Sequence, residues 1–255
     1  MADEVILTPS LQFDNPKQVA DTFIGKRGWF EVGKSAGNRS IWAKKINSNK
    51  GGIKPKILFI GGVHGNENEG VAFAVDFCKE FAFENETTDL SYDFYLLPIF
   101  NPDGFIQYKR QNDNGVDLNR NMATKDWSSN CEVEKYFPGV SAGSEPESKI
   151  LAKIIDDFQP NYILSLHSWK PMINTNGPVE EIAHKMYNSL PPNERIGDTM
   201  HISDDIGYPT PGSLGTYTGW EKKIPTITLE FARGDKLEEI YPRFRDMILA
   251  GFEVI

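Results

Sequence analysis

The sequence is short of the features that mark nucleic-acid-binding, disulfide-stabilised and membrane-spanning proteins. Only 2 of its 255 residues are cysteine, and its formal net charge is −9 at pH 7. Two cysteines are too few for a disulfide framework or a cysteine-based zinc site, so Cys78 and Cys131 are expected to be free thiols or, alternatively, one bridge. An acidic chain without a basic tract favours neither a nucleic-acid nor an anionic membrane partner. No apolar run could span a bilayer.

A secretory signal is also missing from residues 1–20, which lack a basic start and a continuous apolar stretch. As the sequence is written, we therefore expect a cytoplasmic protein. A periplasmic or secreted location is the alternative if a signal has been removed. The sequence makes no prediction of oligomeric state.

Apolar runs alternate with helical patterns, which predicts an α/β protein with a mixed, mostly parallel twisted sheet flanked by helices. No internal repeat or linker divides the chain, so we expect one domain over residues 1–255. A capping-box pattern at Ser144–Glu147 predicts a helix after it, and a closing helix is expected from Leu237 to Phe252. The predicted strands are Lys56–Ile60, Phe94–Pro98, Tyr162–Leu166 and Ile224–Phe231.

Polar side chains follow three of these strands where each one ends. His64 comes shortly after the first, His167 directly follows the third, and Glu230 lies near the end of the fourth. Ligands of open α/β sheets bind beyond the carboxyl ends of strands, so we expect these residues to share one rim. The long polar stretch from 101 to 143 is expected to serve the same site.

The pattern His64-x-x-Glu67 offers two metal ligands of the kinds that zinc prefers, and His167 is the best candidate for a third. Three protein ligands would leave one position for water, as catalytic zinc requires. On its own the short spacing is weak evidence, because histidine and glutamate three residues apart also occur on solvated helix faces.

Further segments strengthen the case because they occur in a fixed order. From about Gly33 to the C-terminal helix, the chain resembles the zinc carboxypeptidases of the carboxypeptidase A type, and within them the bacterial murein peptide amidases. The segments that carry the resemblance are Asn101-Pro102-Asp103-Gly104, Arg110, Asn114–Asn121, Gly143–Glu147, Leu166-His167-Ser168, Thr210–Ser213 and Thr228–Phe231.

The resemblance implies a role for each matched residue. His64, Glu67 and His167 would hold one Zn²⁺ per chain, Glu230 would act as general base and acid, and Arg110 would stabilise the oxyanion. Asn119 and Arg120 would bind the terminal carboxylate of the substrate. Tyr208 resembles a tyrosine that closes over substrate, and Leu214 falls near the position that sets side-chain preference. Asp117 is interpreted separately, as a residue that orients Asn119, Arg120 or a zinc-bound histidine.

The resemblance also implies the reaction and the substrate partner. The expected reaction is cleavage of the amide between γ-D-glutamate and meso-diaminopimelate in a cell-wall peptide with a free terminal carboxylate. Diaminopimelate needs a further polar contact, for which Lys170, Asn174 and Arg233 are candidates. Three alternatives remain: a carboxypeptidase for C-terminal L-amino acids, an acyl-amino-acid deacylase, and a silent module that binds wall peptides.

Trp169 is the best tryptophan candidate for a substrate groove, and His184 and His201 are expected to be surface or packing residues.

Overall fold

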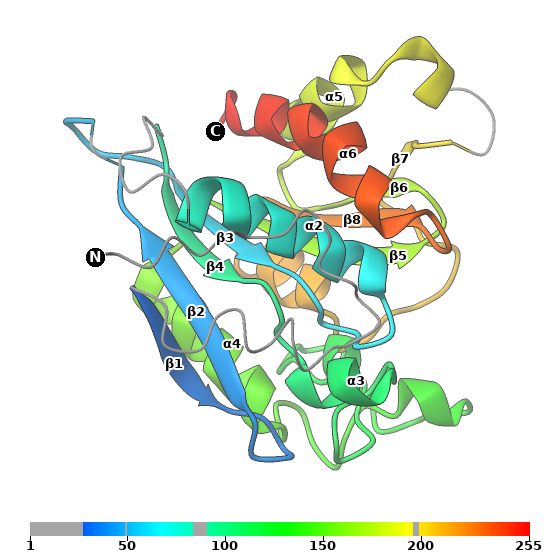
Figure 1. The fold of residues 1–255 in the computed structure, drawn as a ribbon. Helices are drawn as coiled ribbons and strands as arrows, with labels where there is room; N and C mark the ends of the chain where they lie inside the picture. The colour runs from blue at the N-terminus through cyan, green and yellow to red at the C-terminus, as the bar shows by residue number, and fades with distance from the viewer. Residues whose placement is uncertain (1–27, 49, 84–90, 196–198) are drawn as a thin grey trace.

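The computed structural model describes residues 28–48, 50–83, 91–195 and 199–255. Within them, one sheet of eight strands carries helices on both faces (Figure 1). The strands are β1 (Trp29–Lys34), β2 (Ser40–Ile46), β3 (Lys56–Ile60), β4 (Asp93–Leu97), β5 (Tyr162–Trp169), β6 (Met172–Asn176), β7 (Ile202–Ser203) and β8 (Thr226–Ala232). The α-helices are α2 (Asn68–Cys78), α3 (Pro102–Gln107), α4 (Pro146–Phe158), α5 (Glu180–Ser189) and α6 (Leu237–Phe252).

Shorter helical turns connect these elements. They are η1 (Lys79–Phe83), η2 (Leu118–Arg120), η3 (Glu134–Tyr136), η4 (Pro192–Glu194) and η5 (Thr216–Glu221). The turns η2 and η3 lie in the long polar stretch between β4 and α4, so this stretch has little regular structure of its own.

The sheet has the strand order β1-β2-β4-β3-β5-β8-β6-β7. Its centre is parallel, because β3 pairs in parallel with β4 and β5, and β5 pairs in parallel with β8. Antiparallel pairs join β1 to β2, β2 to β4 and β6 to β8. The predicted mixed, mostly parallel sheet flanked by helices is confirmed.

The central strands form because their apolar side chains are covered on both faces. Every residue of β5 except Trp169 is buried, and four of the five residues of β3 are buried. Near-continuous apolar runs of this kind are typical of parallel strands covered on both sides. The strand β5 extends past the predicted end because His167 pairs with Glu230, and Ser168 with Phe231, in the ladder with β8.

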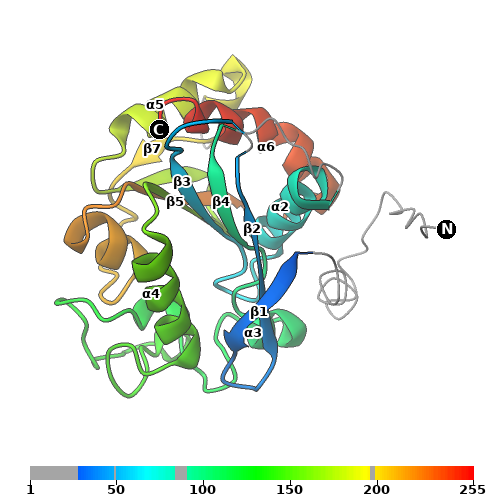
Figure 2. The same ribbon diagram turned by 90° about the vertical axis from the view of Figure 1, so that its left-hand side faces the viewer.

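The helices form two layers, which Figure 2 shows on either side of the sheet. The layer of α2, α5 and α6 buries an aromatic core in which the rings of Phe59 and Phe77 lie 4.5 Å apart. The helix α4 covers the other face and buries Leu151, Ile154 and Ile155. Full burial of each such side chain stabilises the fold by about 1.5–3 kcal/mol. The two layers hold the ends of β3, β5 and β8 in fixed positions.

The helix predicted after Ser144 is confirmed, but the capping box is wrong. The N-cap is Glu145, and its side chain makes no capping hydrogen bond. The Ser144 hydroxyl donates to Glu145 Oε1 at 2.7 Å, while the Glu147 carboxylate accepts from the Ala36 amide at 3.0 Å. A contact with the adjacent Glu145 takes the Ser144 side chain away from the helix end, and a tertiary contact with Ala36 does the same for Glu147. Pro146, in the first turn, fits the start of the helix because it has no amide hydrogen to satisfy.

Both cysteines are free thiols, with Cys78 buried in α2. Within the described ranges, no helix combines the length and the apolar character that crossing a membrane requires.

Candidate metal centre and active site

The loop after β3 positions His64 and Glu67. Gly62 has a φ of 64°, a left-handed conformation that glycine adopts without strain. Gly65 packs directly against the backbone of the 101–104 segment, because a Cβ atom on it would lie 1.9 Å from the carbonyl carbon of Gly104. A side chain at Gly65 would force the two loops apart. The tight turn brings the chain back to start α2 at Asn68, immediately after Glu67.

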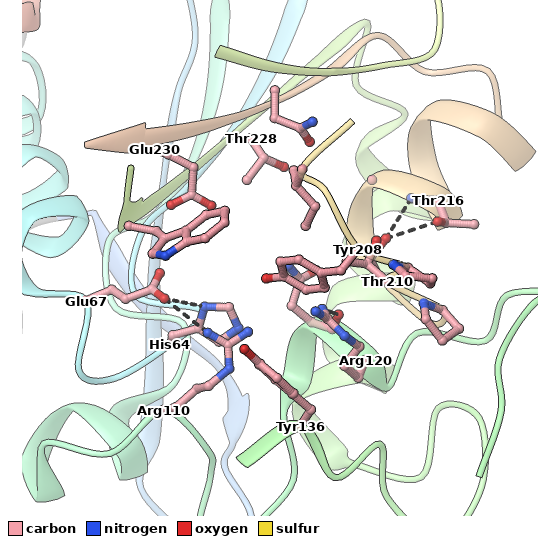
Figure 3. A pocket seen from close by; sticks show the side chains of 18 of the residues that line it. His64, Glu67, Arg110, Arg120, Tyr136, Tyr208, Thr210, Thr216, Thr228 and Glu230 are labelled. Carbon is pink, nitrogen blue, oxygen red and sulfur yellow. Dashed lines mark hydrogen bonds and ion pairs between the residues drawn. The ribbon is translucent and has the colours of Figure 1, made fainter. Parts of the chain in front are cut away.

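The buried side chains of His64 and Glu67 meet at this turn (Figure 3), and His167 of β5 joins them to form a cluster of three. The Nδ1 atom of His64 lies 2.9 Å from Oε1 of Glu67, and Nδ1 of His167 lies 2.9 Å from Oε2 of the same carboxylate. The two Nδ1 atoms are 3.0 Å apart. The structure thus brings together the three residues predicted as metal ligands, with their donor atoms facing one another.

The second nitrogen of each histidine has its own partner. Nε2 of His64 lies 3.0 Å from Oδ1 of Asp117, and Nε2 of His167 lies 3.0 Å from Oγ of Ser165. Hydrogen bonds of this type fix the ring orientation and the tautomer of metal-binding histidines. They leave both Nδ1 lone pairs available to a metal.

Buried charges in the cluster stabilise one another. Burial alone would oppose ionisation of Glu67, yet the attraction of His64 and His167 holds its pKa well below the usual range. Asp117 is also buried, and attraction to Arg110 and His64 keeps its pKa below the usual range. Two carboxylates are therefore ionised beside the candidate ligand atoms, which suits a divalent cation.

Glu230 is a carboxylate outside the cluster of His64, Glu67 and His167, and its surroundings differ from those of Glu67. It lies on β8 opposite His167, and its Oε2 atom is buried without a hydrogen-bond partner among the described residues. Burial is the main reason that the pKa of Glu230 is raised to about 7. A carboxyl group with a pKa near neutrality can take up a proton and release it again at physiological pH.

Arg110 lies between Asp117 and Glu67. Its Nε donates to Oδ2 of Asp117 at 2.8 Å, and its Nη1 donates to Oε1 of Glu67 at 3.2 Å. Asp117 therefore orients both Arg110 and His64, and Oδ1 also accepts from the Asn119 amide at 3.0 Å. The interpretation of Asp117 as an orienting residue agrees with all three contacts.

A cavity of about 1100 Å³ opens beside the cluster. It is lined by most of the residues singled out from the sequence, namely His64, Glu67, Arg110, Asn119, Arg120, Trp169, Asn174, Tyr208, Glu230 and Arg233. His184 and His201 are exposed and do not line it, as expected, and the Lys170 side chain does not line it either.

The side chains of Asn119 and Arg120 reach the cavity from the turn η2. The Oδ1 atom of Asn119 accepts from the Leu214 amide at 2.8 Å, and Arg120 donates to the Asn119 carbonyl at 2.6 Å. The first bond uses the side-chain oxygen of Asn119, so its NH₂ group is free to act as a donor. Tyr208 projects into the cavity, with its ring 5.9 Å from the Arg120 guanidinium and 5.9 Å from the Trp169 ring (Figure 3).

The prediction that the Leu214 side chain contacts substrate is wrong. Leu214 is 3% exposed, packs in the apolar core on the α4 side of the sheet, and does not line the cavity. Its neighbours Ser213, Gly215 and Thr216 line the cavity instead. The turn directs the Leu214 side chain inward, because an apolar side chain is more stable away from water. Leu214 acts on the site only through the backbone amide that holds Asn119.

Tyr136 is a cavity residue that the sequence did not reveal. Its ring lies 5.2 Å from the Arg110 guanidinium and 5.4 Å from that of Arg120, within the range of cation–π attraction. It also lies 6.2 Å from the ring of Tyr208. Tyr136 stands in the irregular stretch before α4, outside any periodic pattern or recognised motif, so no sequence signal was available.

The cavity also has polar side chains on the edge formed by β6 and β8. Asn174, Asn176 and Thr228 line it there, and the Asn176 amide donates to Oδ1 of Asn174 at 3.0 Å. Asp204 and Asp205 line it after β7. This wall offers hydrogen-bond donors and acceptors.

Two curated relatives match about two thirds of this chain or more. Murein peptide amidase A from Escherichia coli (strain K12) is 29% identical over 185 residues, which cover 68% of this chain and 70% of that protein. Carboxypeptidase O from Bos taurus is 28% identical over 220 residues, with coverage of 71% and 58%.

Two solved structures match most of this chain in three dimensions. The murein-tripeptide amidase from Escherichia coli O157 has a TM-score of 0.67 and 25% identity, and the match covers 89% of this chain and 92% of that one. Carboxypeptidase A from Helicoverpa armigera shows the same fold, with a TM-score of 0.75, 19% identity and coverage of 93% and 70%. The family model described as zinc carboxypeptidase matches residues 28–241, so the chain belongs to the zinc carboxypeptidase family of metallopeptidases.

Proposed function

We propose that this chain is a zinc-dependent hydrolase that cleaves the amide bond before a C-terminal amino acid, and that its substrate is γ-D-glutamyl-meso-diaminopimelate in murein peptides. The observation that carries the proposal is the content of one cavity. Two members of the three-residue cluster, His64 and Glu67, line it, together with Glu230, which has an unpaired buried carboxylate oxygen, and with the polar side chains of Asn119 and Arg120.

The ligand cluster fits Zn²⁺ by its chemistry. Two imidazole nitrogens and one carboxylate are a known ligand set of catalytic zinc, and their donor atoms lie within 4.8 Å of one another. Bound there, Zn²⁺ supplies Lewis acidity, which polarises a carbonyl group and makes water more acidic. We assign His64, Glu67 and His167 as its ligands, and Asp117 and Ser165 as the groups that orient the two imidazoles.

Glu230 is the residue to which we assign proton transfer. Its carboxylate takes a proton from the attacking water and delivers it to the leaving amide nitrogen, which leaves poorly without protonation. The unpaired Oε2 atom provides the acceptor, and the raised pKa allows the group to exist in both states near neutral pH.

Arg110 is the residue to which we assign stabilisation of the oxyanion. Asp117 holds its guanidinium through Nε, so the charge is fixed before the reaction starts. A preorganised positive charge lowers the barrier because negative charge develops on the carbonyl oxygen during attack.

Asn119 and Arg120 are proposed to bind the free carboxylate of the leaving residue, with Tyr208 covering it. A guanidinium matches both oxygens of a carboxylate, and the Asn119 NH₂ group adds a neutral donor. The Tyr208 ring stands beside the Arg120 guanidinium, at 5.9 Å, and projects into the cavity.

Polar residues at the β6–β8 edge support a polar leaving residue. The side chain of diaminopimelate ends in an ammonium and a carboxylate, and both need hydrogen-bond partners in a binding site. Asn174, Asn176 and Thr228 provide neutral donors and acceptors, and Asp204 and Asp205 provide negative charge. An apolar pocket would favour an aromatic or aliphatic leaving residue instead.

A substrate panel tests the proposal. Zinc-loaded protein is incubated with L-Ala-γ-D-Glu-meso-diaminopimelate, with the same peptide ending in L-Lys, and with α-linked L-peptides, and products are identified by mass spectrometry. We expect diaminopimelate and L-Ala-D-Glu from the first peptide, slower cleavage of the second, which lacks the distal carboxylate, and intact L-peptides. Release of C-terminal L-amino acids with the murein peptide left intact would support the general carboxypeptidase alternative. Hydrolysis of an N-acyl amino acid added to the panel, with every peptide left intact, would support the deacylase alternative.

A further inference from the structure

Arg233 is a cavity residue for which the proposed reaction has no role. It follows β8, and its backbone amide donates to the Trp169 carbonyl at 3.1 Å. Its side chain is 48% exposed, lines the cavity, and brings Nη2 to 3.9 Å from Oε1 of Glu67. A guanidinium therefore lies next to a proposed zinc ligand, where the reacting bond must be.

Most N–H donors of the Arg233 guanidinium make no hydrogen bond within the described residues. An arginine carries five N–H donors, and within the described part of the chain only one bond is made, from Nη2 to the Asn66 carbonyl at 3.2 Å. Arg110 differs, because Asp117 and Glu67 both hold it. Arg233 can thus accept an anionic partner without breaking an existing close ion pair.

Arg233 and Arg120 have different neighbours in the cavity. Arg120 stands beside Tyr208, across the cavity from Glu67 (Figure 3), whereas Arg233 is bonded to Asn66, the residue before Glu67. If Arg120 holds the carboxylate of the leaving residue, the acyl residue extends toward Asn66 and Arg233. The acyl side of the scissile amide therefore lies next to the Arg233 guanidinium.

A γ-linked glutamate has a feature on that side which an ordinary peptide lacks. Its α-carboxylate is free, whereas the α-carbonyl of an α-linked residue is part of the scissile amide. Building on the proposed function, we propose that Arg233 binds the free α-carboxylate of the acyl-side glutamate and so selects γ-glutamyl amides over α-peptides. Arg233 is then a determinant of specificity and takes no part in proton transfer.

The neighbouring Asn66 provides a second point of contact. Its Oδ1 atom is buried and has no hydrogen-bond partner among the described residues, and Asn66 lines the cavity. The carbon that bears the α-carboxylate of a γ-linked glutamate also bears the glutamate's own amide N–H, which joins it to the carbonyl of the preceding residue. The Asn66 side chain is an acceptor for that N–H, at the place where the Asn66 carbonyl holds Arg233.

Other cations around the cavity are less well placed. Lys109 and Lys135 line it, but Lys135 lies over the Tyr136 ring at 4.8 Å, and both side chains belong to the Arg110 and Tyr136 side. Of the lysine and arginine side chains in the described residues, Arg110 and Arg233 are the two that approach Glu67 within ion-pair distance, and Arg110 is already paired with Asp117.

A neutral analogue of the substrate tests the role of Arg233. In L-Ala-γ-D-isoglutaminyl-meso-diaminopimelate, an amide replaces the α-carboxylate and the scissile bond is unchanged. We expect wild-type protein to have a kcat/KM about 10–100-fold higher for the D-glutamyl peptide than for this analogue, as for a hydrogen bond to a charged group. Arg233→Gln should bring that ratio close to one, mainly by raising KM for the D-glutamyl peptide, and Arg233→Lys should restore part of it.

A matched control variant and a binding measurement show whether Arg233→Gln acts by removing a contact with the substrate or by changing the net charge or the structure. Lys170→Gln removes the same unit charge from a neighbouring segment whose side chain does not line the cavity, so the wild-type ratio should persist. Calorimetry of both peptides with Glu230→Gln protein, with and without Arg233→Gln, should give the same loss of discrimination in affinity.

Three outcomes would overturn the proposal. If wild-type protein cleaves both peptides equally well, the α-carboxylate is not recognised and only the proposed reaction stands. If Arg233→Gln lowers kcat/KM equally for both peptides, Arg233 has a structural role. If wild-type protein cleaves neither peptide, the proposed function fails and this inference fails with it.

Discussion

Replacement of Glu230 by glutamine is expected to lower kcat for hydrolysis of the murein tripeptide by about 10²–10⁴-fold, the usual contribution of a positioned general base and acid. Glutamine has nearly the same shape, but it can neither take a proton from water nor give one to the leaving nitrogen. Glu230 is not among the three proposed zinc ligands, so zinc content and peptide affinity should stay close to those of the wild type. Turnover is measured by release of diaminopimelate, zinc by elemental analysis, and affinity by calorimetry.

The control for this variant is Glu239→Gln, which removes a carboxylate on the exposed face of α6, where it pairs with Lys236. It should retain wild-type turnover. If Glu230→Gln kept wild-type kcat, the general base would have to be another group. If the variant lost zinc as well as turnover, Glu230 would belong to the metal site and the proposed division of roles would be wrong.

Replacement of Arg110 by alanine is expected to lower kcat by about 10²–10³-fold, as removal of one oxyanion donor does in other hydrolases. KM should change less, because the charge on the carbonyl oxygen develops only during attack. Arg110→Lys should recover part of the loss, since lysine keeps the charge but lacks the planar fork. Steady-state kinetics with the tripeptide measure both parameters.

Arg39→Ala serves as the matched control for Arg110. Arg39 also pairs with two carboxylates, at 2.7 Å to Asp103 and 2.9 Å to Asp113, but it does not line the cavity. Its replacement should affect thermal stability more than kcat. Equal losses of kcat in the two variants would show that disruption of an ion-pair network, rather than loss of oxyanion stabilisation, explains the Arg110 result.

The central sheet could be predicted because its signals are local. Continuous apolar runs at Lys56–Ile60 and Tyr162–Leu166 leave few options other than buried strands, and both strands lie where the sequence placed them. Polar residues follow these two runs, and Glu230 lies near the end of the run Ile224–Phe231, so the sequence predicts His64, His167 and Glu230 at one rim. Their shared rim follows from the parallel arrangement of β3, β5 and β8.

What could not be predicted depends on contacts between distant segments. The Ser144–Glu147 pattern fits a capping box, but Glu147 instead accepts a hydrogen bond from Ala36, a residue far away in the sequence. The resemblance places Leu214 near the position that sets side-chain preference, but the turn directs its side chain into the core. Sequence spacing does not contain such information, because it depends on which side of a loop faces the sheet.

The position of Tyr136 and the full set of Asp117 contacts could not be predicted for the same reason. Both residues lie in the irregular stretch between β4 and α4, where no periodicity relates a position to a direction in space. The sequence suggests that Asp117 orients Asn119, Arg120 or a zinc-bound histidine, and it does not indicate the contact with Arg110. The structure identifies its partners as His64, Arg110 and Asn119.

Anomalous diffraction at the zinc edge, from crystals of zinc-loaded protein that is active on the tripeptide, tests most directly the claim that His64, Glu67 and His167 hold the catalytic metal. We expect one strong peak per chain, about 2.0–2.2 Å from Nδ1 of each histidine and from the Glu67 carboxylate. A peak held by other residues, or the absence of any peak at these three side chains in active protein, would contradict the assignment.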